Sequence, residues 1–304
     1  MKLKKALGSV SLLLAAVIWG FAFVAQTAGA ETIPTFTFNF LRSYIAFIFL
    51  AVLIALFSIK NKNVLPRTAA SKKSLLKGGV CCGIALFIAT SLQQYGISLY
   101  PEGAGASGRA GFITALYVVL VPCVSAVLFK KRIHPLVWCG VLLAVFGMYR
   151  LCFSEGFSRL YMGDVLIFMC ALCFCGHILV IDNFVAESNG ILLSAIQFLT
   201  MGTLSFMAML IFEEPDLDAV LQSIASVLYL GIMSSGVAYT LQVIGQKHTE
   251  PTVASILMSL ESVFALVGGW LILGEKLSPA ELFGCGLVFA AIIVAQLPGF
   301  IKKQ

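Results

Sequence analysis

Ten long apolar runs separated by short polar segments dominate this sequence of 304 residues. A helix needs about 20 apolar residues to cross a bilayer. Each run is long enough, and the runs fall at about 7–26, 36–57, 75–98, 104–129, 135–153, 163–181, 191–212, 220–244, 253–273 and 279–297. Inside the hydrocarbon core no water is present to hydrogen-bond the backbone, so a spanning segment must be a helix or part of a closed β-barrel. The strands of a barrel are short and alternate apolar with polar residues, unlike these unbroken apolar runs. We therefore expect an all-α integral membrane protein with ten transmembrane helices.

Charged residues make up only 11% of the chain, whereas soluble domains contain about 25%. The polar segments between the runs are too short for a folded domain outside the membrane. This excludes a soluble enzyme, a nucleic-acid partner and a receptor with a sensor domain. The lipid bilayer is the expected partner, and the oligomeric state stays open.

The distribution of Lys and Arg predicts the orientation of the chain. With the amino terminus inside, the inner segments carry 15 basic residues and the outer loops carry three, Arg150, Arg159 and Lys276. Cytoplasmic loops are usually the basic ones. We expect a multi-pass protein of the cell membrane, plasma or inner, with both termini cytoplasmic. The first run resembles a secretory signal, but its length favours retention as a helix.

The sequence also resembles itself at an offset of 144 to 149 residues. Leu92-Gln93 matches Leu241-Gln242, and Leu116 matches Leu260. Each half contains five runs, an odd number, so the second half enters the membrane with the opposite orientation. We expect two inverted five-helix repeats, 1–153 and 163–300, joined by an outer linker at 154–162. Inverted repeats suit transport by alternating access.

Several motifs resemble those of the EamA family in the drug/metabolite transporter (DMT) superfamily. They are Trp19-Gly20, Leu41-Arg42, Ala110-Gly111-Phe112-Ile113-Thr114-Ala115-Leu116-Tyr117-Val118-Val119-Leu120-Val121-Pro122, Ala238-Tyr239-Thr240-Leu241, Leu257-Met258-Ser259-Leu260-Glu261-Ser262-Val263-Phe264 and Leu273-Gly274-Glu275-Lys276-Leu277-Ser278-Pro279. The resemblance covers nearly the whole chain and implies a secondary active transporter of small metabolites, not an enzyme. It suggests amino acids or related compounds as substrates and efflux as the direction. One departure is Phe174, which stands where the family often has a second tryptophan.

Glu261 is the deepest acid. It lies about ten residues into the ninth run, roughly 15 Å into the membrane at 1.5 Å per residue. An ionisable residue at this depth usually faces the bundle interior or a water-filled cavity. The functional interpretation is a site for a proton or a substrate amine, and the alternative is a structural acid bonded to a neighbouring helix. The repeat-equivalent residue is Tyr117, so the site is asymmetric.

Two arginines lie inside apolar runs, Arg42 in the second and Arg109 near the start of the fourth. Either is able to attract a substrate carboxylate or phosphate, and either is equally able to reach the polar interface along its flexible side chain. Asn39 lies three residues before Arg42 and shares its helical face. Gln197 replaces Arg42 in the second half.

The third and eighth runs carry rows of polar residues. Tyr239, Gln242 and Gln246 recur on one face, and Gln93 repeats part of that row in the first half. Gln93 and Gln242 either line a central cavity or join helices by hydrogen bonds. An aromatic wall for such a cavity is available from Trp19, Tyr95 and Tyr117, with packing against lipid or core as the alternative.

Nine cysteines are scattered through the chain, most densely at Cys170, Cys173 and Cys175, close to His177. Their odd number and their absence from the outer loops favour small buried apolar residues over disulfides. We expect no metal site and no cofactor, because no phosphate-binding glycine loop or zinc-hydrolase spacing is present. His177 alone is a candidate proton relay.

Two other functions stay open beside transport. A channel needs a ring of like polar groups, which the unmatched Glu261 and Tyr117 do not provide. A membrane-embedded enzyme needs a pair of acids, or a histidine and an acid, at depth. The substrate, the direction, and coupling to protons or another ion are not readable from the residues.

Overall fold

The structure is a computed structural model, and it describes residues 2–60, 68–101, 106–130, 132–152, 161–186, 189–273 and 279–301. Every regular element in these ranges is a helix, and η1 is a π-helix. The elements are α1 (Lys2–Ala30), α2 (Thr35–Lys60), α3 (Ala69–Ser98), α4 (Ala106–Ala115), α5 (Tyr117–Leu128), α6 (Pro135–Cys152), α7 (Met162–Val185), α8 (Gly190–Phe212), α9 (Leu217–Gln222), α10 (Ile224–Leu228), η1 (Tyr229–Ala238), α11 (Tyr239–Gln246), α12 (Pro251–Met258), α13 (Glu261–Leu273) and α14 (Pro279–Ile301).

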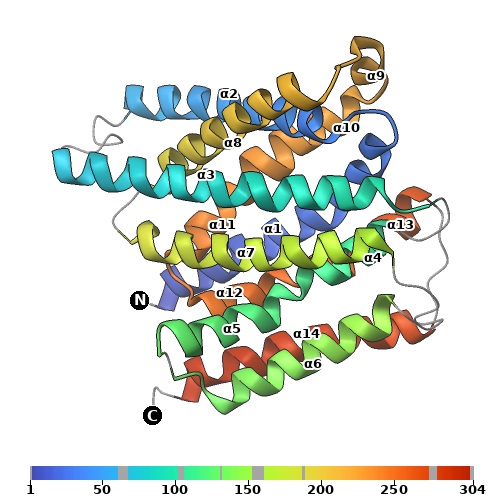
Figure 1. The fold of residues 1–304 in the computed structure, drawn as a ribbon. Helices are drawn as coiled ribbons and strands as arrows, with labels where there is room; N and C mark the ends of the chain where they lie inside the picture. The colour runs from blue at the N-terminus through green and yellow to red at the C-terminus, as the bar shows by residue number, and fades with distance from the viewer. Residues whose placement is uncertain are drawn as a thin grey trace.

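The expected all-helical membrane class is confirmed. Within the described ranges, eight helical segments are long and apolar enough to cross a membrane. Two further apolar helical stretches, Pro135–Gly147 and Leu282–Ala295, are shorter. The long helices lie side by side in one bundle, and both ends of the chain lie at the same end of it (Figure 1). We call this the proximal end and the opposite one the distal end.

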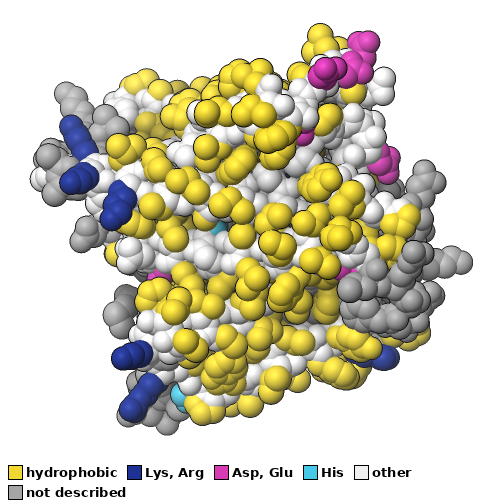
Figure 2. Space-filling model, in the orientation of Figure 1, with side chains coloured by type: hydrophobic (Ala, Val, Ile, Leu, Met, Phe, Trp, Pro, Cys, Tyr) yellow, Lys and Arg dark blue, Asp and Glu magenta, His cyan; other side chains and the backbone are white. Residues whose placement is uncertain are grey.

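The surface of the bundle is that of a protein solvated by lipid. Large apolar side chains such as Leu142, Leu210 and Ile293 are exposed, and hydrophobic side chains cover most of the face in Figure 2. Charged side chains gather at the two ends. Most of the basic side chains in Figure 2 lie at the proximal end, and a group of exposed acids lies at the distal end beside α9.

Glycines let the helices approach closely, as is common in membrane proteins. A Cβ added at Gly140 would lie 3.0 Å from the Ala291 carbonyl oxygen, which packs α6 against α14. A Cβ added at Gly20 would lie 2.3 Å from Phe264 Cβ, which packs α1 against α13. At these contacts backbone meets backbone or the first atoms of a side chain.

Three of the apolar runs are not continuous α-helices. The fourth is interrupted at Leu116 between α4 and α5, and the ninth at Ser259 and Leu260 between α12 and α13. Around the second break, Ser259 Oγ bonds the Ile256 carbonyl and Ser262 Oγ bonds the Ser259 carbonyl. A serine hydroxyl that donates a hydrogen bond to a backbone carbonyl competes with the backbone hydrogen bonds of a regular helix.

The eighth run contains η1, ten residues of π-helix between two α-helical segments. Such segments are rare and are frequent at functional sites. Gly231 and Gly236 bring η1 close to α2, because a Cβ at either position would meet Ile45 or Phe49 within 2.8 Å. The interruptions in the fourth, eighth and ninth runs all lie beside one cavity, described next.

Candidate functional site

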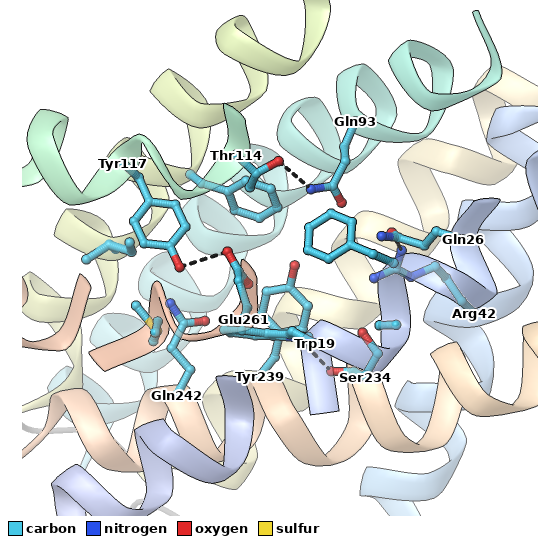
Figure 3. Close-up of a pocket in the computed structure, with 15 residues that line it drawn as sticks. Trp19, Gln26, Arg42, Gln93, Thr114, Tyr117, Ser234, Tyr239, Gln242 and Glu261 are labelled. Carbon is cyan, nitrogen blue, oxygen red and sulfur yellow. Dashed lines mark hydrogen bonds between the residues drawn. The ribbon is translucent and has the colours of Figure 1, made fainter. Parts of the chain in front are cut away.

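A partly open cavity lies inside the bundle, where side chains of α1, α2, α3, α7, η1 and α11 meet those beside the two helix breaks. Its empty space is about 450 Å³ when the open solvent at its mouth is included. Its walls combine apolar and aromatic side chains with a few polar groups (Figure 3). The lining residues are Trp19, Ala22, Phe23, Gln26, Arg42, Gln93, Thr114, Tyr117, Phe174, Ile178, Ser234, Tyr239, Gln242, Met258 and Glu261.

Tyr117 and Glu261 both line the cavity and contact each other in its wall. The Tyr117 hydroxyl donates a hydrogen bond to Glu261 Oε1 at 2.9 Å (Figure 3). Tyr117 is the first residue of α5 and Glu261 is the first residue of α13, so each directly follows a break. The positive end of a helix dipole favours a negative charge such as the Glu261 carboxylate. The Glu261 residue is 4% exposed.

Arg42 occupies another wall and is 2% exposed. Its Nε donates to Ser235 Oγ at 3.1 Å, and its Nη1 donates to Gln26 Oε1 at 3.1 Å. Both acceptors are neutral. In the described part of the chain Arg42 belongs to no ion pair, and neither does Glu261. The cavity therefore contains a cationic side chain and an acidic one that do not neutralise each other directly.

Tyr239 lies between these two groups in Figure 3 and also lines the cavity. The ring is fixed by Trp19, whose ring centroid lies 4.7 Å away in an edge contact. Trp19 Nε1 in turn donates to the Ser234 carbonyl of η1 at 3.3 Å. This chain of contacts ties the π-helix to α1 and to the cavity.

The two glutamines of the polar rows both line the cavity. Gln93 Nε2 donates to Thr114 Oγ1 at 3.1 Å. Gln242 Oε1 is buried and has no hydrogen-bond partner among the described residues. A buried acceptor without a partner carries a cost in free energy, and a ligand with an N–H or O–H group would remove that cost.

Seven of the eleven predicted pathway residues line the cavity. They are Trp19, Arg42, Gln93, Tyr117, Tyr239, Gln242 and Glu261. Phe174, which stands in place of the second tryptophan, also lines it. Tyr95 does not, because it is 53% exposed on the outside of the bundle. For Tyr95 the alternative holds, since its side chain lies on the lipid-facing surface.

His177 and Gln197 lie one layer behind the cavity. His177 Nε2 and Gln197 Oε1 are 3.2 Å apart, and the His177 ring packs edge-on against Tyr239 with centroids 5.9 Å apart. Asn39 is completely buried, and its side-chain amide has no partner in the described ranges. None of these three residues lines the cavity.

Arg109 lies at the distal end, away from the cavity. It forms an ion pair with Asp164, in which Nη2 and Oδ2 are 2.7 Å apart. The sequence left open a contact between Arg109 and a substrate, but in the structure this arginine does not line the cavity and instead joins α4 to α7. Asp164 was not among the predicted residues, although two opposite charges near the ends of apolar runs are themselves a signal of pairing.

Three other polar lining residues were missed, namely Gln26, Thr114 and Ser234. Gln26 lies at the end of its run and resembles an interface residue, while Thr and Ser are common in membrane helices. Among the described residues, no three His, Cys, Asp or Glu side chains come together as possible metal ligands.

Several known proteins that are similar to this chain are named as transporters. An uncharacterized transporter of Archaeoglobus fulgidus is 30% identical over 97% of this chain and 87% of its own length. YoaV of Bacillus subtilis, also an uncharacterized transporter, is 24% identical over 96% of both chains. YedA of Escherichia coli K12, an uncharacterized inner membrane transporter, is 21% identical over 94% of this chain and 89% of its own.

A solved crystal structure of a protein has the same fold, with a TM-score of 0.77 and 20% sequence identity over 98% of this chain and 99% of the other. The model of the EamA-like transporter family matches twice, at residues 6–152 and 161–296. Together these two matches span nearly the whole chain. The protein therefore belongs to the EamA-like transporter family.

Proposed function

We propose that this protein is a secondary active transporter of small metabolites that works by alternating access. The observation that carries the proposal is the cavity inside the bundle, into which a buried Arg42 and a buried Glu261 project with no ion-pair partner among the described residues. Burying an unpaired charge in a bundle costs several kcal/mol, and such residues mark substrate or ion pathways.

The arrangement of helices supports two inverted five-helix repeats, residues 1–153 and 163–300, with ten membrane helices when the shorter α6 and α14 are included. Two close backbone contacts repeat between the halves, Gly96 with Gly163 and Gly245 with Gly8. Gly96 and Gly245 correspond at the offset of 149 residues. The breaks at Leu116 and Leu260 also fall at matching positions of the two halves.

The substrate that best fits the cavity carries both charges, as an amino acid or a related compound does. The Arg42 guanidinium suits a carboxylate, because a charge-assisted hydrogen bond to it is strong. At the other side Glu261 and the unpartnered Gln242 Oε1 offer acceptors for an ammonium group. Trp19 and Phe174 supply apolar and aromatic surface for a side chain.

Glu261 is also the proposed site of proton coupling. An acid that faces a cavity and has no cationic partner is able to bind either a proton or a substrate amine. Competition between the two on one carboxylate would link substrate movement to the proton gradient. This favours export from a cytoplasm that is more alkaline than the outside.

The proximal end is proposed to be cytoplasmic. Lys72, Lys73, Lys77, Lys130 and Arg132 are exposed there, while Glu214, Asp216 and Asp218 are exposed at the distal end. The positive-inside rule then places both termini in the cytoplasm of a cell membrane. Lys131 and Lys302, which contribute to the charge count in the sequence, lie outside the described residues.

The test is uptake of radiolabelled amino acids into proteoliposomes without ATP. We expect saturable uptake that is accelerated by unlabelled substrate inside the vesicles, because exchange requires only movement of the loaded cavity. Arg42→Gln should abolish it, while Arg132→Gln, which removes an exposed arginine at the proximal end, should not. Uptake that rises linearly with concentration and shows no exchange would indicate a channel and overturn the proposal.

A further inference from the structure

Four residues at the distal end form a cluster that we name the distal clasp: Tyr100, Arg109, Tyr161 and Asp164. Arg109 contacts both oxygens of the Asp164 carboxylate, with Nε 3.1 Å from Oδ1 and Nη2 2.7 Å from Oδ2. The Tyr100 hydroxyl donates to Oδ1 at 2.7 Å, and the Tyr161 backbone N–H donates to Oδ2 at 2.9 Å. Each carboxylate oxygen thus has two donors.

The two tyrosine rings flank the guanidinium of Arg109. The Arg109 carbon Cζ lies 5.9 Å from the Tyr100 ring centroid and 5.0 Å from that of Tyr161. Cation–π contacts at such distances add to the ion pair. Burial and the hydrogen bond to Asp164 raise the pKa of Tyr100, so its hydroxyl stays protonated and remains a donor.

The clasp rests on a rigid base formed by α3 and α7. A Cβ added at Gly163, the residue before Asp164, would lie 2.6 Å from the Gly96 carbonyl oxygen. A Cβ added at Gly96 would in turn lie 3.2 Å from the Gly163 carbonyl oxygen. Because the two backbones are in direct contact, Asp164 has a fixed position to which α4 is attached through Arg109.

Helix α4 connects the clasp to the cavity. Arg109 lies in its first turn and Thr114 lies near its end, and Tyr117 follows directly after the break at Leu116. At 1.5 Å per residue, Arg109 and Tyr117 are about 12 Å apart along the axis. A helix of ten residues is short enough to move as one body. A shift at Arg109 would therefore displace Thr114 and Tyr117.

We propose that Arg109 and Asp164 are positioning residues that hold α4 so that Tyr117 reaches Glu261. The inference rests on the proposed function only in treating the Tyr117–Glu261 contact as part of a transport pocket. Neither Arg109 nor Asp164 touches the cavity. Their effect on it passes through α4 and through the hydroxyl of Tyr117.

Among the residues that the structure describes, the clasp has no ionic counterpart at the proximal end. There α1 and α11 cross at Gly8 and Gly245, where a Cβ at Gly245 would lie 2.9 Å from the Gly8 carbonyl oxygen. The positions that correspond to Asp164, Arg109 and Tyr100 are Ser9, Val253 and Thr249, and none of these is a charged residue. Loss of the clasp should therefore release the distal end of the bundle and leave the proximal contact intact.

The test is hydrogen–deuterium exchange of the purified full-length chain in lipid nanodiscs, which needs no substrate. Exchange reports the free energy of local opening. Arg109→Gln and Asp164→Asn should each raise exchange about tenfold in α4 and in the first turns of α5 and α13, with α6 unchanged. Arg132→Gln is the matched control and should change none of these segments.

A second variant separates positioning from local stability. Tyr117→Phe should raise exchange in the first turns of α5 and α13 but not at the start of α7. If the clasp acts through Tyr117, the double variant Arg109→Gln/Tyr117→Phe should exchange at α13 no faster than Tyr117→Phe alone.

Three outcomes would overturn the proposal. One is faster exchange confined to residues 106–109 and 161–165. Another is a uniform rise that includes α6 and α14, which would make the pair a contributor to global stability. The third is an additive effect of the double variant at α13. Because no transport is measured, none of these outcomes depends on whether the protein moves the proposed substrate.

Discussion

The Tyr117 hydroxyl donates a hydrogen bond of 2.9 Å to the Glu261 carboxylate, and the two residues are separated by 144 positions in the chain. This separation equals the offset at which Leu116 matches Leu260, so the bonded residues occupy corresponding places in the two halves. In the proposed pair of inverted repeats, residues related by the internal two-fold axis come into contact only near that axis. On this proposal the centre holds one acid and one donor, where two acids would repel each other.

This pairing leads to the first prediction. Tyr117→Phe removes the donor and leaves a buried carboxyl oxygen without its partner, so the chain should unfold about 1 kcal/mol more easily. Glu261→Ala removes the acceptor of the same hydrogen bond. We expect the double variant to be less destabilised than the sum of the single variants, as for residues in direct contact.

The measurement is a thermal-unfolding cycle of the four proteins in one detergent. Tyr95→Phe is the control, because Tyr95 is exposed on the lipid side and its hydroxyl should matter little. Strict additivity of Tyr117→Phe and Glu261→Ala would show that the hydrogen bond contributes nothing to the fold.

The second prediction concerns Arg42, which presents a fork of donors held by Gln26 and Ser235. Arg42→Lys keeps the charge but loses the planar fork, so it should bind an amino acid at least about tenfold more weakly. Arg42→Gln should bind more weakly still.

Substrate-induced stabilisation of the folded protein measures both affinities. Amino acid amides, which lack the carboxylate, should bind the wild-type protein weakly and lose little in either variant. Equal losses for amino acids and their amides would contradict a carboxylate contact at Arg42.

The third prediction concerns orientation. A membrane-impermeant thiol reagent added to intact cells should label a cysteine introduced at Asp216 but not one introduced at Lys73 or Lys130. Asp216 lies at the distal end, and the two lysines lie at the proximal end. The parent protein measures the background from the nine native cysteines. Labelling at Lys130 without permeabilisation would reverse the proposed orientation.

Much of the fold follows from the sequence, because an apolar stretch long enough to cross a membrane nearly always does so as a helix. Periodicity alone does not locate the breaks at Leu116 and Leu260, since both lie in unbroken apolar runs. The breaks determine where Tyr117 and Glu261 begin their helices. The sequence therefore singles out Tyr117 and Glu261 as candidates without the geometry that brings them together.

The candidate site was predictable where a polar group lies deep in a run, as for Glu261, Gln93 and Gln242. It was not predictable for Gln26 at the end of a run, because depth along a helix does not reveal which neighbour a side chain faces. Arg109 illustrates the same limit. Its partner Asp164 lies 55 residues away, on a helix whose packing against α4 only the tertiary structure provides.

The last prediction is that Glu261 is required for coupling and not for folding. Its carboxyl faces the cavity, accepts one hydrogen bond from Tyr117, and has no cationic partner in the described part of the chain. Glu261→Gln keeps the shape and still accepts a hydrogen bond from Tyr117, but it cannot change charge. The variant should therefore insert normally and exchange substrate across the membrane, and it should lose accumulation driven by a pH gradient.

Paired assays in proteoliposomes separate the two roles of Glu261. Exchange is measured at equal pH on both sides, accumulation is measured with a pH gradient, and the amount of folded protein is measured by size-exclusion chromatography. Asp218→Asn, which neutralises an exposed acid at the distal end, should change none of the three. Accumulation that survives in Glu261→Gln would place the proton elsewhere. A parallel loss of exchange, accumulation and folded protein would make Glu261 a structural acid, because coupling alone does not affect how much protein folds.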